Sequence, residues 1–299
     1  MLFLFVLLLS LTGMLKAQVT TAGMSGKVMA DEESVIGATV VAVHEPSGTS
    51  YGTVTNVDGR FSLQGMRSGG PYKVTVSYIG YQTAIYTDIQ LQLGETYSLN
   101  VTLHEASELL GEITITASKS KFSAEKTGAT TNISSEQLTT LPSINRSISD
   151  FTRISPYASG NSFGGRDGRS NTFTVDGANL NNNFGLSSGL PGGGNPISLD
   201  AIDEVQVVIA PYDVRQANFI GAGINAITKS GTNAYRGSAY MYFNNEVMRG
   251  NKIGDTDFGV RAEESKTVYG ATFGGPIIKD KLFFFANVEY EKSPQQVIT

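Results

Sequence analysis

The sequence predicts a mainly β chain in three parts: an N-terminal β-sandwich, an α+β segment, and about the first three antiparallel strands of an incomplete transmembrane β-barrel. The composition is 40% hydrophobic and only 16% charged, with 34 glycines in 299 residues, which is unlike a soluble enzyme with a surface rich in Lys and Glu. Short alternating apolar runs fill the early part of the chain, and longer alternating runs of about ten residues close it. These three observations set the fold class.

Composition also argues against several classes of function. The formal net charge of −5 and a pI of about 5.2 give no basic surface, so we expect no nucleic-acid partner. The absence of cysteine excludes disulfides, thiolate metal sites and cysteine nucleophiles. His44 and His104 are each followed directly by Glu and lack the i, i+4 spacing of a helical zinc site, so we interpret both as ordinary surface residues. We therefore predict no enzyme, no catalytic residue, no metal and no cofactor.

Residues 1–17 are predicted to be a secretory signal peptide. The run MLFLFVLLLSLTGMLKAQ is apolar up to Lys16, and it is shorter than the roughly 20 residues of a spanning helix. Cleavage is expected after Ala17. A membrane anchor is the alternative.

Residues 18–104 are predicted to form the sandwich, because strand-like runs alternate there with turn residues about every 8 to 12 positions. Alternation sends Phe61 and Leu63 inward on one strand, and Val74, Val76 and Tyr78 inward on another. The pieces SGKV, VIGATVVA, GTVTNVDGRFSL and YKVTVSYIGY resemble the carboxypeptidase-regulatory-like domain, which has a transthyretin-like or carbohydrate-binding-like fold. That resemblance implies no peptidase activity.

Residues 105–121 are predicted to be a linker that contains a β-prone strip. The strip consists of Glu112, Ile113, Thr114, Ile115 and Thr116. Between two domains, such a strip can pair with the sheet edge of a partner through main-chain hydrogen bonds. The alternative is that it forms the first strand of the next domain.

Residues 122–232 contain both helical and strand signals. Ser134 or Ser135 is a helix N-cap, and the helix is expected to end before Pro142. A second helix is predicted over 149–153, a strand over 171–175, and a further strand in which Val205, Val207 and Ile209 alternate.

The stretch GINAITKS at 223–230 has Gly223, Lys229 and Ser230 at the spacing of a phosphate-binding loop, but Thr228 takes the place of the second glycine. The alternative is a strand over 224–228 that ends this domain, after which the chain turns into the next. A phosphate-binding loop has to open a helix, whereas the residues that follow alternate as a strand.

Three blocks in this region resemble the plug domain of TonB-dependent outer-membrane receptors: NTFTVDGANLNN, LDAIDEVQVVIAPYD and GAGINAITKSGTN, in that order. The resemblance implies a plug over 122–232, in a receptor of the large-barrel Oar/SusC-like type that also has a regulatory-like domain in front. At Ala210 and Pro211 the chain departs from the Gly-Pro of most plugs, which argues against the usual iron-siderophore assignment.

Residues 233–299 are predicted to begin a transmembrane β-barrel, because three runs alternate over lengths of about ten residues. A long polar loop at 246–265 and a tight turn at 278–280 connect the runs. The residues expected to face lipid are Tyr235, Gly237, Ala239, Met241, Phe243, Tyr269, Ala271, Phe273, Ile277, Leu282, Phe284, Ala286, Val288 and Tyr290. Those expected to face the lumen are Arg236, Ser238, Tyr240, Tyr242, Asn244, Asn287, Glu289 and Glu291.

Candidate substrate or barrel contacts lie in the loops of the predicted plug. Arg166 and Arg169 flank Asp167 in the loop GGRDGRSN, and Asn181 and Asn182 follow the first plug block. The alternative for the arginines is an ion pair within the plug. The asparagine-rich stretch resembles a calcium loop only in composition, because it lacks the spacing of an EF-hand.

The family resemblance implies an energised outer-membrane receptor that takes up a large nutrient such as an oligosaccharide or a peptide. Its partners would be a TonB-like periplasmic energy-coupling protein, outer-membrane lipid and a surface lipoprotein. The strip at 112–116 would then be the TonB-box-like coupling strip on which the energy-coupling protein pulls. The sandwich would lie in the periplasm. The competing hypotheses are a secreted or surface module that binds carbohydrate or protein, and a nucleotide-binding enzyme.

Overall fold

The computed structural model describes residues 19–30, 33–105, 113–116, 129–141, 146, 148–181, 197–211, 216, 219–257, 259 and 265–293. The predicted signal peptide lies outside this part of the chain. No helix among the described residues is long and apolar enough to cross a membrane. The chain divides into two compact units, Met1–Thr228 and Lys229–Thr299.

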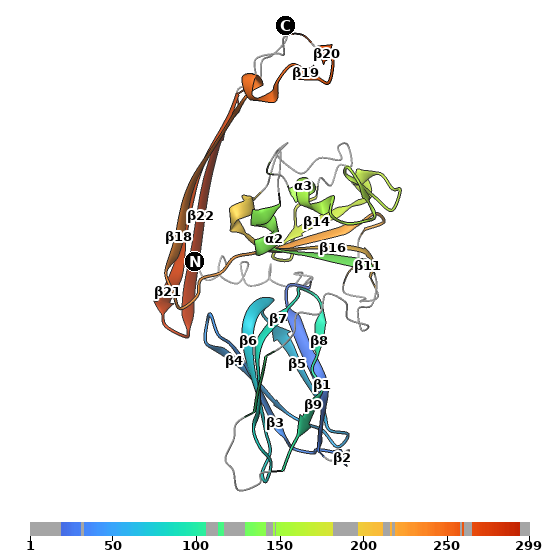
Figure 1. Cartoon of the computed structure of the whole chain (residues 1–299), viewed down its shortest axis with the longest axis vertical. Helices are drawn as coiled ribbons and strands as arrows, with labels where there is room; N and C mark the ends of the chain where they lie inside the picture. The colour runs from blue at the N-terminus through green and yellow to red at the C-terminus, as the bar shows by residue number, and fades with distance from the viewer. Residues whose placement is uncertain are drawn as a thin grey trace, which may run out of the picture. The chain divides into compact units, whose positions relative to one another are not determined.

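The sandwich consists of two sheets (Figure 1). In the first, β1 pairs with β2 and β5 antiparallel and with β8 and β9 parallel. The second has the strand order β10-β7-β6-β3-β4. The strands are β1 (Ala22–Ala30), β2 (Glu33–Ser34), β3 (Thr39–His44), β4 (Thr49–Val54), β5 (Arg60–Met66), β6 (Gly69–Ser77), β7 (Ala84–Leu91), β8 (Thr96–Ser98), β9 (Val101–Leu103) and β10 (Ile113–Thr116).

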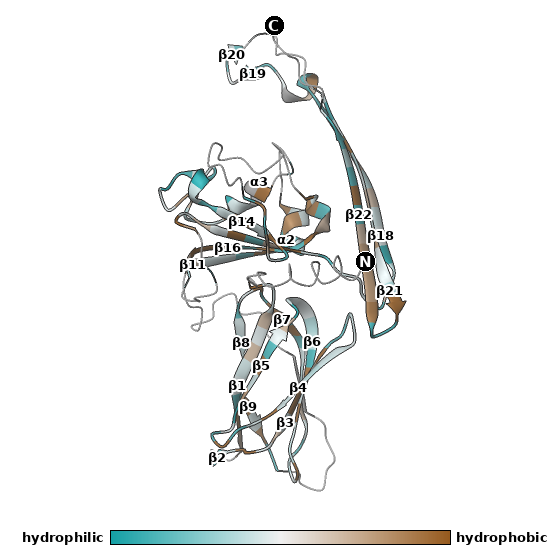
Figure 2. Ribbon diagram, turned by 180° about the vertical axis from the view of Figure 1, so that it is seen from behind, coloured by the Kyte–Doolittle hydropathy of each residue, from teal (hydrophilic) through white to brown (hydrophobic). Residues whose placement is uncertain are grey.

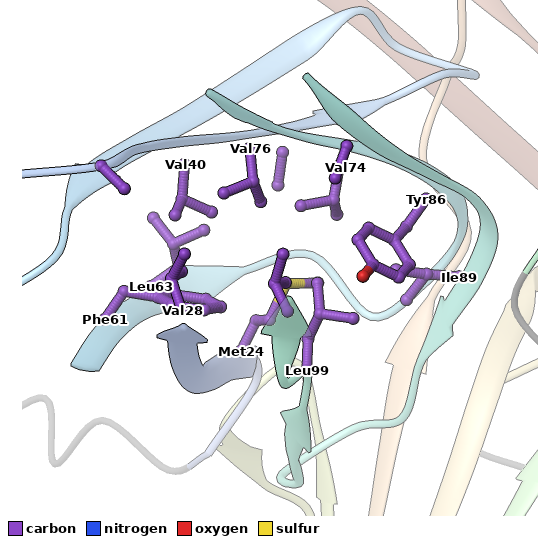
Figure 3. Close-up of a cluster of buried hydrophobic side chains, with 14 of the residues drawn as sticks. Met24, Val28, Val40, Phe61, Leu63, Val74, Val76, Tyr86, Ile89 and Leu99 are labelled. Atoms are coloured by element: carbon purple, nitrogen blue, oxygen red, sulfur yellow. The ribbon is translucent and has the colours of Figure 1, made fainter. Parts of the chain in front are cut away.

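Side chains from the two sheets meet in one apolar core (Figure 3). Val74 and Val76 of β6 are fully buried, and Phe61 and Leu63 of β5 are 4% and 5% exposed, which confirms the predicted inward faces of these two strands. Tyr78 was expected to follow Val76 inward, but that expectation is wrong. The strand ends at Ser77, and Tyr78 begins a turn and is exposed.

His44 was expected at the surface and is instead buried at the end of β3. Its Nδ1 lies 2.7 Å from Ser47 Oγ, and its ring packs against that of Tyr72. Burial, assisted by the charge of Arg67, lowers the pKa of His44 to about 4. Alternation along β3 explains the placement, because His44 shares its face with the buried Val40 and Ala42. His104 is exposed, as expected.

The segment 129–228 contains a separate core and a five-stranded sheet of order β11-β16-β17-β14-β15. Helix α2 begins after Ser134, whose N–H donates to Gln137 Oε1 (3.1 Å), and ends at Thr140, as the capping signal predicted. The elements are β11 (Ala129–Ser134), α2 (Ser135–Thr140), α3 (Ile148–Thr152), β12 (Ala158–Ser159), β13 (Ser162–Phe163), η2 (Gly168–Ser170), β14 (Thr172–Val175), β15 (Ala178–Asn179), η4 (Leu199–Ala201), β16 (Ile202–Ala210) and β17 (Gly223–Thr228).

The stretch GINAITKS belongs to the sheet, because β17 covers Gly223–Thr228 and pairs with β16 antiparallel and with β14 parallel. No helix occurs in the described residues 229–235. A phosphate-binding loop must open a helix, so that hypothesis is wrong.

The second unit contains a three-stranded antiparallel sheet of order β18-β21-β22. A turn closed by the Lys281 N–H on Ile278 O (3.1 Å) joins β21 and β22. Figure 2 shows apolar and polar residues interleaved along these strands. The elements of this unit are β18 (Arg236–Asn245), η5 (Glu246–Arg249), β19 (Lys252–Ile253), β20 (Thr256–Asp257), β21 (Ser265–Ile278) and β22 (Leu282–Lys292).

Gly26 in β1 provides a test of the sandwich. A Cβ at this position would lie 1.8 Å from Leu99 O, a backbone atom, whereas a Cβ on Gly52 would meet nothing closer than 4.0 Å. We expect Gly26→Ala to lower the free energy of unfolding by about 1 to 3 kcal/mol, because the backbone has to move. Gly52→Ala is the control and should change it far less. Thermal denaturation followed by circular dichroism measures both, and equal effects would contradict this packing.

Candidate functional site

The described part of the predicted coupling strip, Ile113–Thr116, forms β10 at the edge of the second sandwich sheet. It pairs in parallel with β7, with Ile113 opposite Ala84 and Thr116 opposite Thr87. Glu112 lies outside the described residues. The strip is thus a strand of the sandwich, a placement that neither sequence alternative anticipated.

A second feature joins the sandwich to the sheet of segment 129–228. The turn after β7 places Leu93 against β16, where its N–H donates to both carboxylate oxygens of Glu204 (3.1 Å each). Its carbonyl oxygen accepts from Gln206 Nε2 (2.5 Å) and from Asn132 Nδ2 (3.3 Å). We call this set of residues, Leu93, Asn132, Glu204 and Gln206, the junction.

The part of the junction between Leu93 and β16 is closed to solvent, and Asn132 is half-buried. Leu93 is fully buried, and Gln206 and Glu204 are 1% and 7% exposed. Buried polar groups are costly unless they are paired, and here the side chains of β16 and the backbone of Leu93 satisfy one another. The next residue, Gly94, has a φ of +70, and a Cβ there would lie 2.8 Å from Gln206 Nε2. The turn therefore requires glycine for both conformation and space.

The carboxyl group of Glu204 is the electrostatically unusual group of the junction. The pKa of Glu204 is raised to about 7, first by burial and also by the negative charges of Asp203 and Glu95, while the hydrogen bond from the Leu93 N–H opposes the shift. Glu95 lies in the same turn as Leu93 and accepts from Thr130 Oγ1 (3.5 Å) on β11. A protonatable group thus sits where the two cores touch.

Sequence reasoning did not find the junction, because alternation along β16 marked Val205 and Val207 as the buried face. Both faces of this strand are buried: Val205 and Val207 in the core of segment 129–228, and Glu204 and Gln206 against Leu93. The available signal was a Glu and a Gln that alternate with valines along β16.

The three plug-like blocks meet one another at the ends of strands. Asp176, which follows β14 with a φ of +48, accepts from Thr228 N–H (2.9 Å) and Thr228 Oγ1 (2.8 Å). Asn225 accepts from Thr174 Oγ1 (2.9 Å) and donates to Val19 O (2.6 Å). These motif residues therefore fasten the sheet, and Asn225 also holds the chain where it enters the sandwich.

The candidate loop contacts are placed differently from one another. Arg169 is paired with Asp167 (3.2 Å), whose carboxyl pKa is lowered by the hydrogen bonds from Arg169. Arg166 is exposed, and its side chain forms no ion pair within the described chain. Asn181 is bonded to β14, with its Oδ1 accepting from Phe173 N–H (2.5 Å). Asn182 lies outside the described residues.

The sheet of the second unit has one apolar and one polar face. Strand register aligns Met241, Tyr269 and Tyr290, which are 59%, 50% and 64% exposed. On the other face, Tyr240 OH donates to Glu289 Oε2 (2.7 Å), and Ser238 Oγ lies 2.7 Å from Thr272 Oγ1. This division is that of a barrel wall with a lipid face and a lumen face.

Two known domain families match separate parts of the chain, one in the sandwich and one in the second unit. Residues 23–104 match the carboxypeptidase regulatory-like domain, and residues 227–299 match the outer membrane beta barrel domain. The latter match, together with the relative described next, locates the protein at the outer membrane.

The chain is similar to the TonB-dependent transporter Oar of Myxococcus xanthus, with 26% identity over 252 residues that cover 78% of this chain and 23% of Oar. The chain thus spans less than a quarter of that relative's length.

Two solved structures also match part of the chain. The siderophore receptor PirA from Acinetobacter baumannii is 23% identical and covers 55% of this chain and 24% of that chain, with a TM-score of 0.41. PirA from Pseudomonas aeruginosa is 18% identical and covers 56% of this chain and 28% of that chain, with a TM-score of 0.42. Similarity at this level says nothing about the substrate of the present chain.

The raised pKa of Glu204 predicts a pH dependence of stability. Between its ordinary pKa of 4.5 and about 7, the folded chain holds a proton that the unfolded chain has lost, so this group's contribution to stability falls as pH rises through that window. Glu204→Gln retains an acceptor for Leu93 N–H and removes the charge. We expect the free energy of unfolding of the variant, relative to that of the wild type, to rise by about 2 to 3 kcal/mol between pH 4.5 and pH 8.

The comparison is made with the wild type at each pH, because the lowered pKa of His44 gives the opposite slope, with stability lost as pH falls from about 6.5 to about 4. Glu136→Gln makes the same substitution on the exposed face of α2 and should show no such gain. Chemical denaturation at pH 5 and pH 8 measures the free energies of unfolding. If the difference between Glu204→Gln and the wild type is the same at both pH values, the raised pKa of Glu204 is refuted.

Proposed function

We propose that this chain is part of an outer-membrane TonB-dependent receptor that takes up a large nutrient by an energy-coupled rearrangement of its plug. The observation that most supports this proposal is the order of the parts. A regulatory-like sandwich, a segment with three plug-like blocks and a sheet with lipid and lumen faces follow one another, as in a chain related to a TonB-dependent transporter.

In this proposal segment 129–228 is the plug, and the strip at Ile113–Thr116 is where a TonB-like periplasmic protein attaches. A β-prone strip can bind a partner strand through its backbone, and β10 shows that this strip adopts an extended conformation. From the strip the chain continues to β11, which is an edge strand of the plug sheet. A pull on the strip would therefore reach the plug at the edge of its sheet.

The proposed substrate is an oligosaccharide or a peptide, which the resemblance to large-barrel receptors supports. Outer-membrane lipid and a surface lipoprotein are the other proposed partners. Among the proposed plug-loop contacts, Arg166 is the best placed, because it is exposed whereas Arg169 is paired with Asp167 and Asn181 is bonded to β14. Asn182 remains a proposed contact from the sequence.

Cell fractionation tests the location and class. We expect the gene product to sediment with the outer membrane and to resist extraction by high salt, because the face bearing Met241, Tyr269 and Tyr290 needs an apolar environment. Recovery as a soluble periplasmic protein would instead support the secreted binding module.

Partner capture tests the strip. Ile115→Pro removes a backbone donor from β10 and should lower capture by the periplasmic domain of the host's TonB-like protein at least about tenfold, because strand pairing needs that donor. Ile115→Val is the matched control and should bind as the wild type does. Equal capture of the two variants would place the attachment point elsewhere in the chain.

A further inference from the structure

The strip proposed to bind the coupling protein is already occupied in this structure. All four residues of β10 pair in parallel with β7, from Ile113 opposite Ala84 to Thr116 opposite Thr87. Strand β7 is otherwise bordered on that side by nothing in the described sheet, because the order is β10-β7-β6-β3-β4. Strand β10 thus covers a sheet edge of the sandwich.

This attachment is weaker than the ladders beyond it. Strands β10 and β7 share four residue pairs in parallel, whereas β11 and β16 share six in antiparallel register. Parallel pairing is also slightly less stable per residue. A force applied to the strip should therefore separate β10 from β7 before it separates β11 from the plug sheet.

The next point of resistance is the junction. Strand β11, which the chain reaches after residues 117–128, is tied to the sandwich turn by Asn132 Nδ2 on Leu93 O (3.3 Å) and by Thr130 Oγ1 on Glu95 Oε1 (3.5 Å). The weak β10–β7 ladder and the β11 contacts therefore lie one after the other along the path from the strip to the plug.

We propose that the sandwich stores the strip on β7 in the resting protein, and that coupling begins when the strip is transferred from β7 to a strand of the periplasmic energy-coupling protein. This inference rests on the proposed function. The partner strand replaces the main-chain hydrogen bonds that β7 provides, so the backbone groups of the strip stay paired throughout. Transfer also frees the chain between β10 and β11 to carry the pull to the plug.

A reversible lock tests the transfer, and the absence of native cysteine makes the lock specific. We would introduce Thr87→Cys together with Thr116→Cys, because these two residues are opposite each other in the β7–β10 register. Neighbouring strands lie about 4.8 Å apart, which is within the Cα separations that disulfides span. In the full chain purified from outer membranes, the disulfide should form without partner. The oxidised protein should be captured by the periplasmic domain of the host's TonB-like protein at least about tenfold less well than the reduced protein.

The matched control is Val43→Cys with Ser50→Cys, which joins β3 to β4 at the opposite edge of the same sheet. Its oxidation should leave capture unchanged. The proposal is overturned if the 87–116 disulfide does not form in the resting protein, or if the locked protein is captured as well as the reduced one. If the disulfide forms but neither the reduced pair nor the wild type is captured, the proposed coupling function fails and the transfer step with it, while storage of the strip on β7 stands.

Discussion

The contact between the sandwich and segment 129–228 depends on the hydrogen bonds that the buried backbone of Leu93 forms. Leu93 presents an N–H and a carbonyl oxygen to the sheet of segment 129–228 in a buried place, and Glu204, Gln206 and Asn132 supply the partners. Were these groups unpaired, each would oppose contact between the two cores. Because they are paired, the sandwich and segment 129–228 form a single compact unit with two separate apolar cores. This arrangement holds the Glu204 carboxyl group in a buried place that disfavours its charge.

The buried junction and the β10–β7 ladder both bear on the proposed mechanism. A coupling protein has to deliver work to a plug that is stable at rest, and the resting chain has two kinds of attachment on the way. The β10–β7 ladder is made only of backbone pairs, and the junction is made of buried side chains against backbone. The first is short and at an edge, so it yields readily. The second is closed to water around Glu204, and because burial raises the pKa of Glu204 to about 7, loss of its proton weakens this attachment.

Much of the fold could be predicted from the sequence, because period-two alternation survives wherever one face of a strand is buried. It placed Phe61, Leu63 and Val74 correctly, and the cap at Ser134 gave the start of α2. It failed where both faces are buried, as at Glu204 and Gln206, and where a strand stops one residue early, as at Tyr78. His44 was misplaced because its residue type was weighed above its position in the alternation. The extended conformation of Ile113–Thr116 was predictable, but its pairing strand was not, since alternation specifies a face and leaves the neighbour open.

The clip between Asp176 and Thr228 has a mechanical consequence. It ties the last residue of β17 to the corner after β14, two strands that already pair in parallel. The chain therefore leaves this sheet at Thr228, which is held by β16 on one side and by Asp176 on the other. Strand β11 lies on the other side of β16 from β17. A rearrangement that begins at β11 therefore does not require Thr228, where the chain leaves the sheet, to move. In the proposed mechanism, the plug thus opens along one edge while the chain that leads from Thr228 to the following strands keeps a constant length.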